Sequence, residues 1–140
     1  MAYDGIAVSN IVYELKSKFT GGRIDKIYQP GNDEIIFSVR SIKEGNFRVL
    51  LSANSMHPRI HITQIKKENP ISAPMFCMVL RKHIAGGRIL NIYQPDFERI
   101  IIIEVESMNE MGDLGIKRII TEFMGKYSNI ILTDENWRIL

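Results

Sequence analysis

The sequence predicts an α+β domain in which two similar units, each of one helix and about four strands, form a two-layer β-sandwich with flanking helices. The first reason is an internal repeat: residues 21–30 read GGRIDKIYQP and residues 86–95 read GGRILNIYQP, 65 positions later. The second is that an apolar stripe at helical spacing precedes each copy and apolar strands follow it. The third is the composition, because 45% hydrophobic and 24% charged residues in 140 positions are typical of one globular domain, here residues 1–140.

The first unit opens with a predicted helix that Ser9 or Asn10 can cap. Gly21 and Gly22 end this helix, since glycine readily adopts the left-handed conformation that follows a last helical turn. The apolar stripe that should face the core consists of Val8, Ile11, Val12, Leu15 and Phe19.

Four strands are predicted after this helix, over residues 23–28, 35–40, 47–53 and 59–63. In the second of them Ile35, Phe37 and Val39 alternate with Ile36 and more polar residues, which indicates one face turned to the core.

The second unit repeats this order, so the duplicated segments are about 9–63 and 72–133. Ser72 can cap its helix, Pro74 suits the first turn, and Gly86-Gly87 ends it. Strands are predicted over residues 88–93, 100–103, 117–123 and 129–133. Residues 100–103 are all isoleucine, so this strand should be covered on both faces. Residues 134–140 read as a turn into a further strand, which favours a piece of a longer protein.

Several classes of function are disfavoured. The repeated GGRI follows a helix and precedes a strand, the reverse of a dinucleotide-binding loop, so its glycines are expected to stop the helix. No hydrolase or transferase motif is present, and we expect neither an enzyme nor a cofactor. Cys77, the one cysteine, fits buried packing, and His57, His61 and His83 lack the setting of metal ligands, so no metal is expected.

Signals for cellular location and the net charge of the chain narrow the possible classes of function further. The first ten residues, MAYDGIAVSN, lack the basic and apolar regions of a signal peptide, and the longest apolar run is too short to cross a bilayer. These features favour a cytoplasmic protein away from membranes. The formal net charge is only +2, so any nucleic-acid surface must be local.

Two turns could carry chemistry. Asp96-Phe97-Glu98-Arg99 precedes an apolar strand, and it is either a solvated turn with a weak ion pair or a guanidinium held by a carboxylate to grip a phosphate.

The second turn lies in residues 122–129, EFMGKYSN. One interpretation is a simple hairpin. In the other, Gly125 allows a tight turn, Lys126 meets a phosphate and Tyr127 stacks on a base.

Both turns, together with Asp4-Gly5 and the GGRI stretch, resemble the N-terminal domain of the NFACT proteins, the family of the RqcH and fibronectin-binding proteins. The resemblance covers essentially the whole chain, and the E-x-M-G-K-x-SN segment is its specific motif. One departure is that the D-R pair of the family stands here as Glu98-Arg99, which keeps the charge and adds a methylene.

The resemblance implies a tRNA-binding domain of a ribosome quality control factor. Such a factor binds a large ribosomal subunit obstructed by peptidyl-tRNA and recruits tRNA, typically alanyl-tRNA, so that alanine tails are added without mRNA. The tRNA-binding role passes by this resemblance to Asp4, Glu98, Arg99, Glu122, Met124, Gly125 and Lys126. The family also resembles the N-terminal domain of formamidopyrimidine-DNA glycosylases, but Met1-Ala2-Tyr3 lacks their proline nucleophile, so base excision is not expected.

Two other functions remain open from sequence. A surface adhesin that binds fibronectin or fibrinogen is the main rival, although nothing in the chain directs secretion. The third is a structural module that orients further domains, in which Arg99 and Lys126 would be replaceable without loss of RNA binding.

Overall fold

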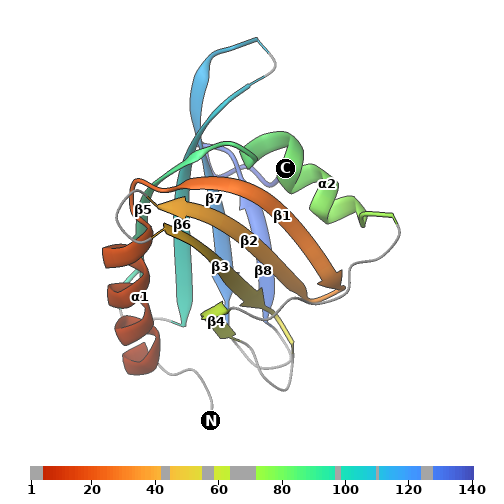
Figure 1. Ribbon diagram of the computed structural model, residues 1–140. Helices are drawn as coiled ribbons and strands as arrows, with labels where there is room; N and C mark the ends of the chain where they lie inside the picture. The colour runs from red at the N-terminus through yellow and green to blue at the C-terminus, as the bar shows by residue number, and fades with distance from the viewer. Residues whose placement is uncertain are drawn as a thin grey trace.

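The computed structural model describes residues 5–41, 45–54, 59–63, 72–96, 99–109, 111–123 and 128–140. Their arrangement is shown in Figure 1. The elements follow in the order α1 (Gly5–Phe19), β1 (Arg23–Gly31), β2 (Glu34–Ser41), β3 (Gly45–Ser52), β4 (Arg59–Thr63), α2 (Met75–Ile84), β5 (Arg88–Tyr93), β6 (Ile100–Met108), β7 (Leu114–Glu122) and β8 (Asn129–Thr133).

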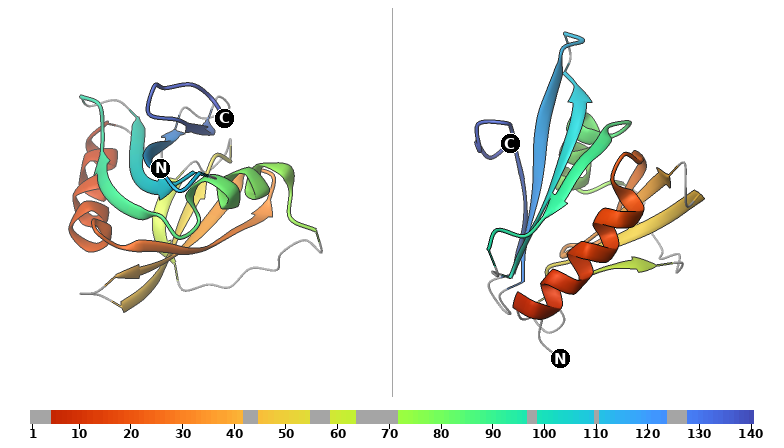
Figure 2. Two further views of the ribbon diagram at one scale, coloured as in Figure 1. Left: turned by 90° about the horizontal axis from the view of Figure 1, so that it is seen from above. Right: turned by 90° about the vertical axis from the view of Figure 1, so that its left-hand side faces the viewer.

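All eight strands belong to one sheet, in the order β4-β3-β2-β1-β5-β6-β7-β8, and every neighbouring pair is antiparallel. The α+β class is confirmed, but the predicted pair of separate sheets is wrong. The two halves join where β1 meets β5 through the pair Arg23↔Arg88. The sheet turns at this join, so that its halves lie across from each other (Figure 2). The sequence pattern could not distinguish one folded sheet from two sheets, because core-facing and solvent-facing residues alternate along the strands in the same way in both.

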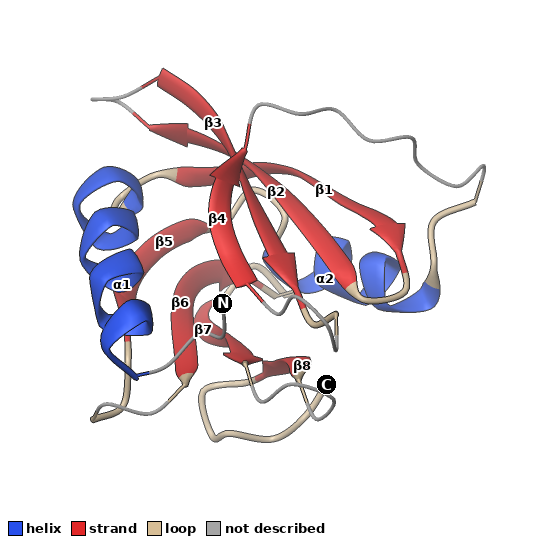
Figure 3. Cartoon of the chain, turned by 90° about the horizontal axis from the view of Figure 1, so that it is seen from below, coloured by secondary structure: helices blue, strands red, loops and turns tan. Residues whose placement is uncertain are grey.

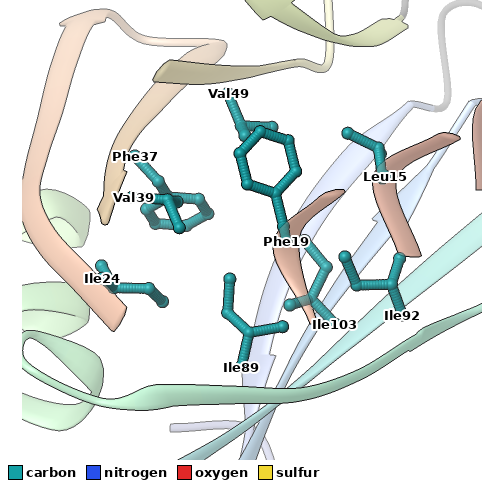
Figure 4. Close-up of a pocket in the computed structure, with 9 residues that line it drawn as sticks. All are labelled: Leu15, Phe19, Ile24, Phe37, Val39, Val49, Ile89, Ile92 and Ile103. Atoms are coloured by element: carbon teal, nitrogen blue, oxygen red, sulfur yellow. The ribbon is translucent and has the colours of Figure 1, made fainter. Parts of the chain in front are cut away.

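The core lies between the two halves and is closed by the helices. Apolar side chains from α1, α2 and all eight strands form one buried cluster. At its centre, nine of them surround a cavity of about 10 Å³, and they come from α1 and from both halves of the sheet (Figure 4). A space of this size and lining stays dry, because water finds no polar partner there.

The two GGRI copies meet at the join and form equivalent hydrogen bonds. The amide of Gly21 donates to the Ile89 carbonyl at 2.7 Å, and the amide of Gly86 donates to the Ile24 carbonyl at 2.7 Å. A second pair runs from Ile24 to Gly87 at 2.9 Å and from Ile89 to Gly22 at 2.8 Å. The repeated sequence is therefore where the halves of the sheet are fastened together.

The glycines of the repeat end the helices as expected. Gly21 and Gly86 have φ angles of 88° and 78°, which is the left-handed region that favours glycine. Gly22 and Gly87 are required for close packing instead. A Cβ on Gly87 would lie 2.5 Å from Val105 Cγ1.

The starts of both helices were predicted wrongly. Helix α1 begins at Gly5, so Ser9 and Asn10 lie inside it and cap nothing. In α2 the N-cap residue is Pro74, without a side-chain cap hydrogen bond, and not Ser72. Apolar periodicity marks a helix more sharply than it marks its first residue.

Strand positions agree closely with the prediction. Strands β4, β5 and β8 have the predicted bounds, while β1, β2, β3, β6 and β7 differ at one or both ends. The buried, apolar β6 is confirmed, with Ile101, Ile102 and Ile103 at most 4% exposed. Of the helices described, none has the length and apolarity to cross a membrane.

Candidate nucleic-acid interface

Two of the predicted functional segments meet at one end of the sheet. Strand β6 begins there at Ile100, which pairs with Glu122 at the end of β7, and Glu122 in turn pairs with Asn129 at the start of β8. The amide of Phe123 donates to the carbonyl of Arg99 at 2.8 Å. Arg99 and Phe123, the described residues that border the two turns, are therefore held side by side.

Helix α1 begins at this same end (Figures 1 and 3). The first turn of a helix presents unpaired amides and a partial positive charge, which favours anions. Asp4, which the resemblance adds to the site, immediately precedes this turn but lies outside the described residues.

Arg99 is a cation of this region that the structure describes. It is exposed, and no hydrogen bond or ion pair occupies its guanidinium within the described ranges. A guanidinium offers five donors in a planar fork that matches the oxygens of a phosphate. Arg99 is therefore free to bind an anion.

Arg118 on β7 shows the opposite situation. Its Nε donates to Glu104 Oε2 at 3.0 Å, and its Nη1 donates to the Glu135 carbonyl at 2.8 Å. The ring of Trp137 stacks on the guanidinium, with 4.1 Å between the Arg118 carbon and the ring centroid. With its side chain 13% exposed, Arg118 is committed to the scaffold and cannot serve a ligand.

Electrostatics around this cluster follow from the same contacts. Burial raises the pKa of the Tyr93 hydroxyl, the Glu104 carboxylate adds to the rise, and Arg118 opposes it. Backbone amides, that of Arg138 first, lower the pKa of Asp134, whose Oδ1 accepts hydrogen bonds at 2.8 Å and 3.0 Å within the last turn. This turn holds Trp137 at φ 66° over Arg118.

The remaining predicted residues are placed as follows. Glu122 is half-buried at the end of β7, next to the fully buried Phe123. Ser128 Oγ, beside the second turn, is buried and has no hydrogen-bond partner in the described structure. Glu98, Met124, Gly125, Lys126 and the ring of Tyr127 lie outside the described residues.

Cys77 was expected to pack in the core, and the structure describes this residue. Cys77 is buried, its amide donates to Gln29 Oε1 at 3.0 Å, and burial raises the pKa of its thiol. His57 lies outside the described residues. The described residues contain no group of three or more His, Cys, Asp or Glu side chains that could hold a metal ion.

The Arg118 cluster was missed at the level of sequence. Its members come from β5, β6, β7 and the last turn, and they are brought together only by the register of the strands. The available signal was that Glu104 and Arg118 interrupt apolar strands, since charged residues in such positions are usually paired.

The chain was compared with known proteins. Residues 4–140 match the family model described as NFACT N-terminal and middle domains. The Rqc2 homolog RqcH of Bacillus subtilis is 47% identical over 134 residues, which cover 96% of this chain and 23% of the relative. The RqcH of Streptococcus pneumoniae is 42% identical over 136 residues, 97% of this chain and 24% of the relative. The chain thus spans about a quarter of the length of these relatives.

Solved structures give the same result. The N-terminal domain of the fibronectin-binding protein PavA from Streptococcus pneumoniae superposes with a TM-score of 0.94 at 43% identity, over 98% of this chain and 52% of that one. The fibrinogen-binding protein from Staphylococcus aureus superposes with a TM-score of 0.89 at 41% identity, over 99% of this chain and 49% of that one. The family match over nearly every residue and the shared fold lead to one conclusion: this chain belongs to the NFACT N-terminal and middle domain family.

Proposed function

We propose that the end of the sheet formed by the start of β6 and the end of β7 is a tRNA-binding surface of a ribosome quality control factor. The observation that carries this is Arg99, whose exposed guanidinium has no partner among the described residues and whose backbone carbonyl accepts a hydrogen bond from the Phe123 amide. Phosphate contacts of this kind position an RNA backbone. Relatives named Rqc2 homolog RqcH support the assignment to ribosome quality control.

In the whole protein, this surface would hold tRNA, alanyl-tRNA in particular, at a large ribosomal subunit that carries a stalled peptidyl-tRNA. The bound tRNA would supply alanine to the stalled chain without mRNA. The role of this domain is binding in the cytoplasm and not catalysis, because the candidate surface needs only phosphate and base contacts. Lys126, Gly125, Met124, Glu98 and Asp4 belong to the proposed surface by family resemblance.

Binding of a tRNA transcript to this chain tests the proposal. Affinity is measured by fluorescence anisotropy between about 50 and 200 mM salt for the wild type, Arg99→Ala and Lys126→Ala. Each lost phosphate contact should make the slope of log affinity against log salt shallower by about 0.7–0.9.

Arg138→Ala is the matched control. Arg138 is an exposed cation on the last turn, after β8, and does not belong to the proposed surface. It should leave the affinity and the slope close to those of the wild type. If Arg99→Ala binds with the same slope as the wild type, the proposed surface is wrong.

Fibronectin binding is a second candidate, because a structural neighbour at TM-score 0.94 is named a fibronectin-binding protein. We rank it second because no feature of the described surface selects this partner. Tight, saturable binding of immobilised fibronectin, together with no binding of tRNA, would reverse the order.

A further inference from the structure

Three arginines stand in one row across the middle of the sheet. Arg40 on β2 is the direct partner of Arg23 on β1, and Arg23 is the direct partner of Arg88 on β5. Directly opposed residues of antiparallel strands project from the same face, with Cβ atoms about 4.5–5.5 Å apart. Like charges in this position oppose each other, so the row works against the stability of the sheet.

The row lies on the outer face of the sheet. Ile24, Val39 and Ile89, each next in sequence to one of the arginines, are buried in the core. Neighbours along a strand point to opposite faces, and all three arginines are exposed. Their guanidinium groups therefore face solvent together.

Among the described residues, little negative charge offsets the row. Asp25 approaches Arg40, but the closest oxygen is 3.9 Å from Nε, and the Arg40 side chain remains 61% exposed. Glu106 on β6 is the strand partner of Arg88, yet the described residues contain no ion pair between them. Arg88 itself has no polar partner among the described groups.

One arginine has a structural task that the other two lack. Arg23 Nη1 donates to the carbonyl of Gly86 at 3.1 Å, just after α2. This bond satisfies a carbonyl beyond the helix end and holds Arg23 in place. It does not account for Arg40 or Arg88, so stabilisation of a helix end cannot explain the row as a whole.

We propose that Arg40, Arg23 and Arg88 form a second contact for RNA backbone phosphates, beyond the surface at Arg99. Adjacent guanidinium groups with free donors match phosphate oxygens, and a bound phosphate removes the repulsion among them. This inference rests on the proposed function, since it extends the RNA footprint of the same domain.

The position of the row defines the kind of RNA it would meet. Ile100, beside Arg99, and Glu106, opposite Arg88, lie six residue steps apart along β6, which is a path of about 20 Å. A single nucleotide cannot reach both ends of this path. The two contacts therefore require a structured RNA that lays separate parts of its backbone on the domain.

The experiment uses the double variant Arg40→Gln/Arg88→Gln, which spares the anchored Arg23. A tRNA transcript is titrated between about 50 and 200 mM salt. Two lost phosphate contacts should lower the salt slope by about 1.4–1.8, so the wild type should lose about tenfold more affinity than the double variant over this range.

Two further variants test whether the change in tRNA binding depends on charge at the arginine row. Arg138→Gln removes an exposed cation outside the row and should change the slope little. Glu106→Gln removes the one carboxylate in register with Arg88 and should increase the affinity for tRNA. Urea unfolding checks the fold, and the double variant should be at least as stable as the wild type because two opposed like charges are gone.

The outcomes separate the two proposals. If Arg99→Ala weakens binding while the double variant retains the wild-type slope, the arginine row is not an RNA contact and the proposed function stands. The same unchanged slope is expected if the row serves an acidic protein instead. If the double variant has a shallower salt slope while Arg99→Ala keeps the wild-type slope, the arginine row is an RNA contact and the surface proposed at Arg99 is wrong. If the wild type binds no tRNA, both proposals fail for this domain.

Discussion

Arg99 and Arg118 are the same type of residue in two opposite environments. Arg99 is exposed and has no side-chain partner among the described residues, whereas Arg118 is held by Glu104, two carbonyls and the ring of Trp137. In a half-buried ion pair, removal of one partner leaves the other charge unpaired and shielded from water, which costs free energy.

Glu104→Gln should therefore destabilise the domain. The substitution leaves Arg118 with a weaker partner at a site where both side chains are at most 20% exposed. We expect a loss of about 1–3 kcal/mol in the free energy of unfolding in urea. The loss should shrink in an Arg118→Met background, because no charge then remains to be paired.

The matched control is Glu14→Gln on the surface of α1. Glu14 forms only an exposed pair with Lys18 at 3.9 Å, so its substitution should change stability by no more than about 0.5 kcal/mol. Equal effects of Glu104→Gln and Glu14→Gln would contradict the role given to the Arg118 cluster.

At this scale the sequence predicted candidates but not their availability. Arg99 stood out because an acidic and a basic residue precede an apolar strand. Whether a guanidinium is free or occupied depends on residues far away in sequence, such as Trp137 for Arg118. Local patterns do not contain that information.

Among the elements, the join between β1 and β5 is the one where sequence and geometry agree most directly. Each GG pair contains one glycine with a positive φ and one packed against backbone. The two positions of a pair therefore tolerate a side chain differently.

Gly87→Ala should destabilise the domain more than Gly86→Ala. At Gly86 the new methyl meets open space, and only the positive φ opposes it, at about 1–2 kcal/mol. At Gly87 the methyl would lie 2.5 Å from Val105 and 2.9 Å from the carbonyl of Ile84, which is backbone and cannot yield cheaply. Thermal and urea unfolding of the two variants measure the difference, and the reverse order would show that close packing does not hold this join.

Element types, their order and the bounds of β4, β5 and β8 followed from periodicity, glycine and proline. The helix starts did not, because Ser9, Asn10 and Ser72 are good capping residues that the fold leaves unused. The row of three arginines was also invisible in sequence. Arg23, Arg40 and Arg88 become neighbours only through the pairing of β1 with β2 and β5.

The whole molecule has one core that both halves of the sheet line. Phe37 from the first half and Ile103 from the second face the same small cavity (Figure 4). Neither half can keep its inner face dry without the other, so the halves should fold and unfold together.

Phe37→Ala and Ile103→Ala should each lower the unfolding free energy, by about 3–5 and 2–5 kcal/mol. Both should shift one transition, seen at the same urea concentration by far-ultraviolet circular dichroism and by fluorescence of Trp137, the single tryptophan. Trp137 lies in the last turn after β8. If its transition stays in place while circular dichroism shifts in Phe37→Ala, the halves are separate folding units.

Because one continuous sheet replaces two, the described fold has only two outermost strands, β4 and β8, and each is five residues long. An outermost strand offers unpaired amides and carbonyls to any passing chain, and shortness limits that risk. On β8 the risk is reduced again, since Ile139 bridges to Thr133 and the amide of Leu140 donates to the Leu132 carbonyl at 3.0 Å. By pairing with the end of β8, the last turn leaves fewer unpaired amides and carbonyls on this strand for a strand from another chain.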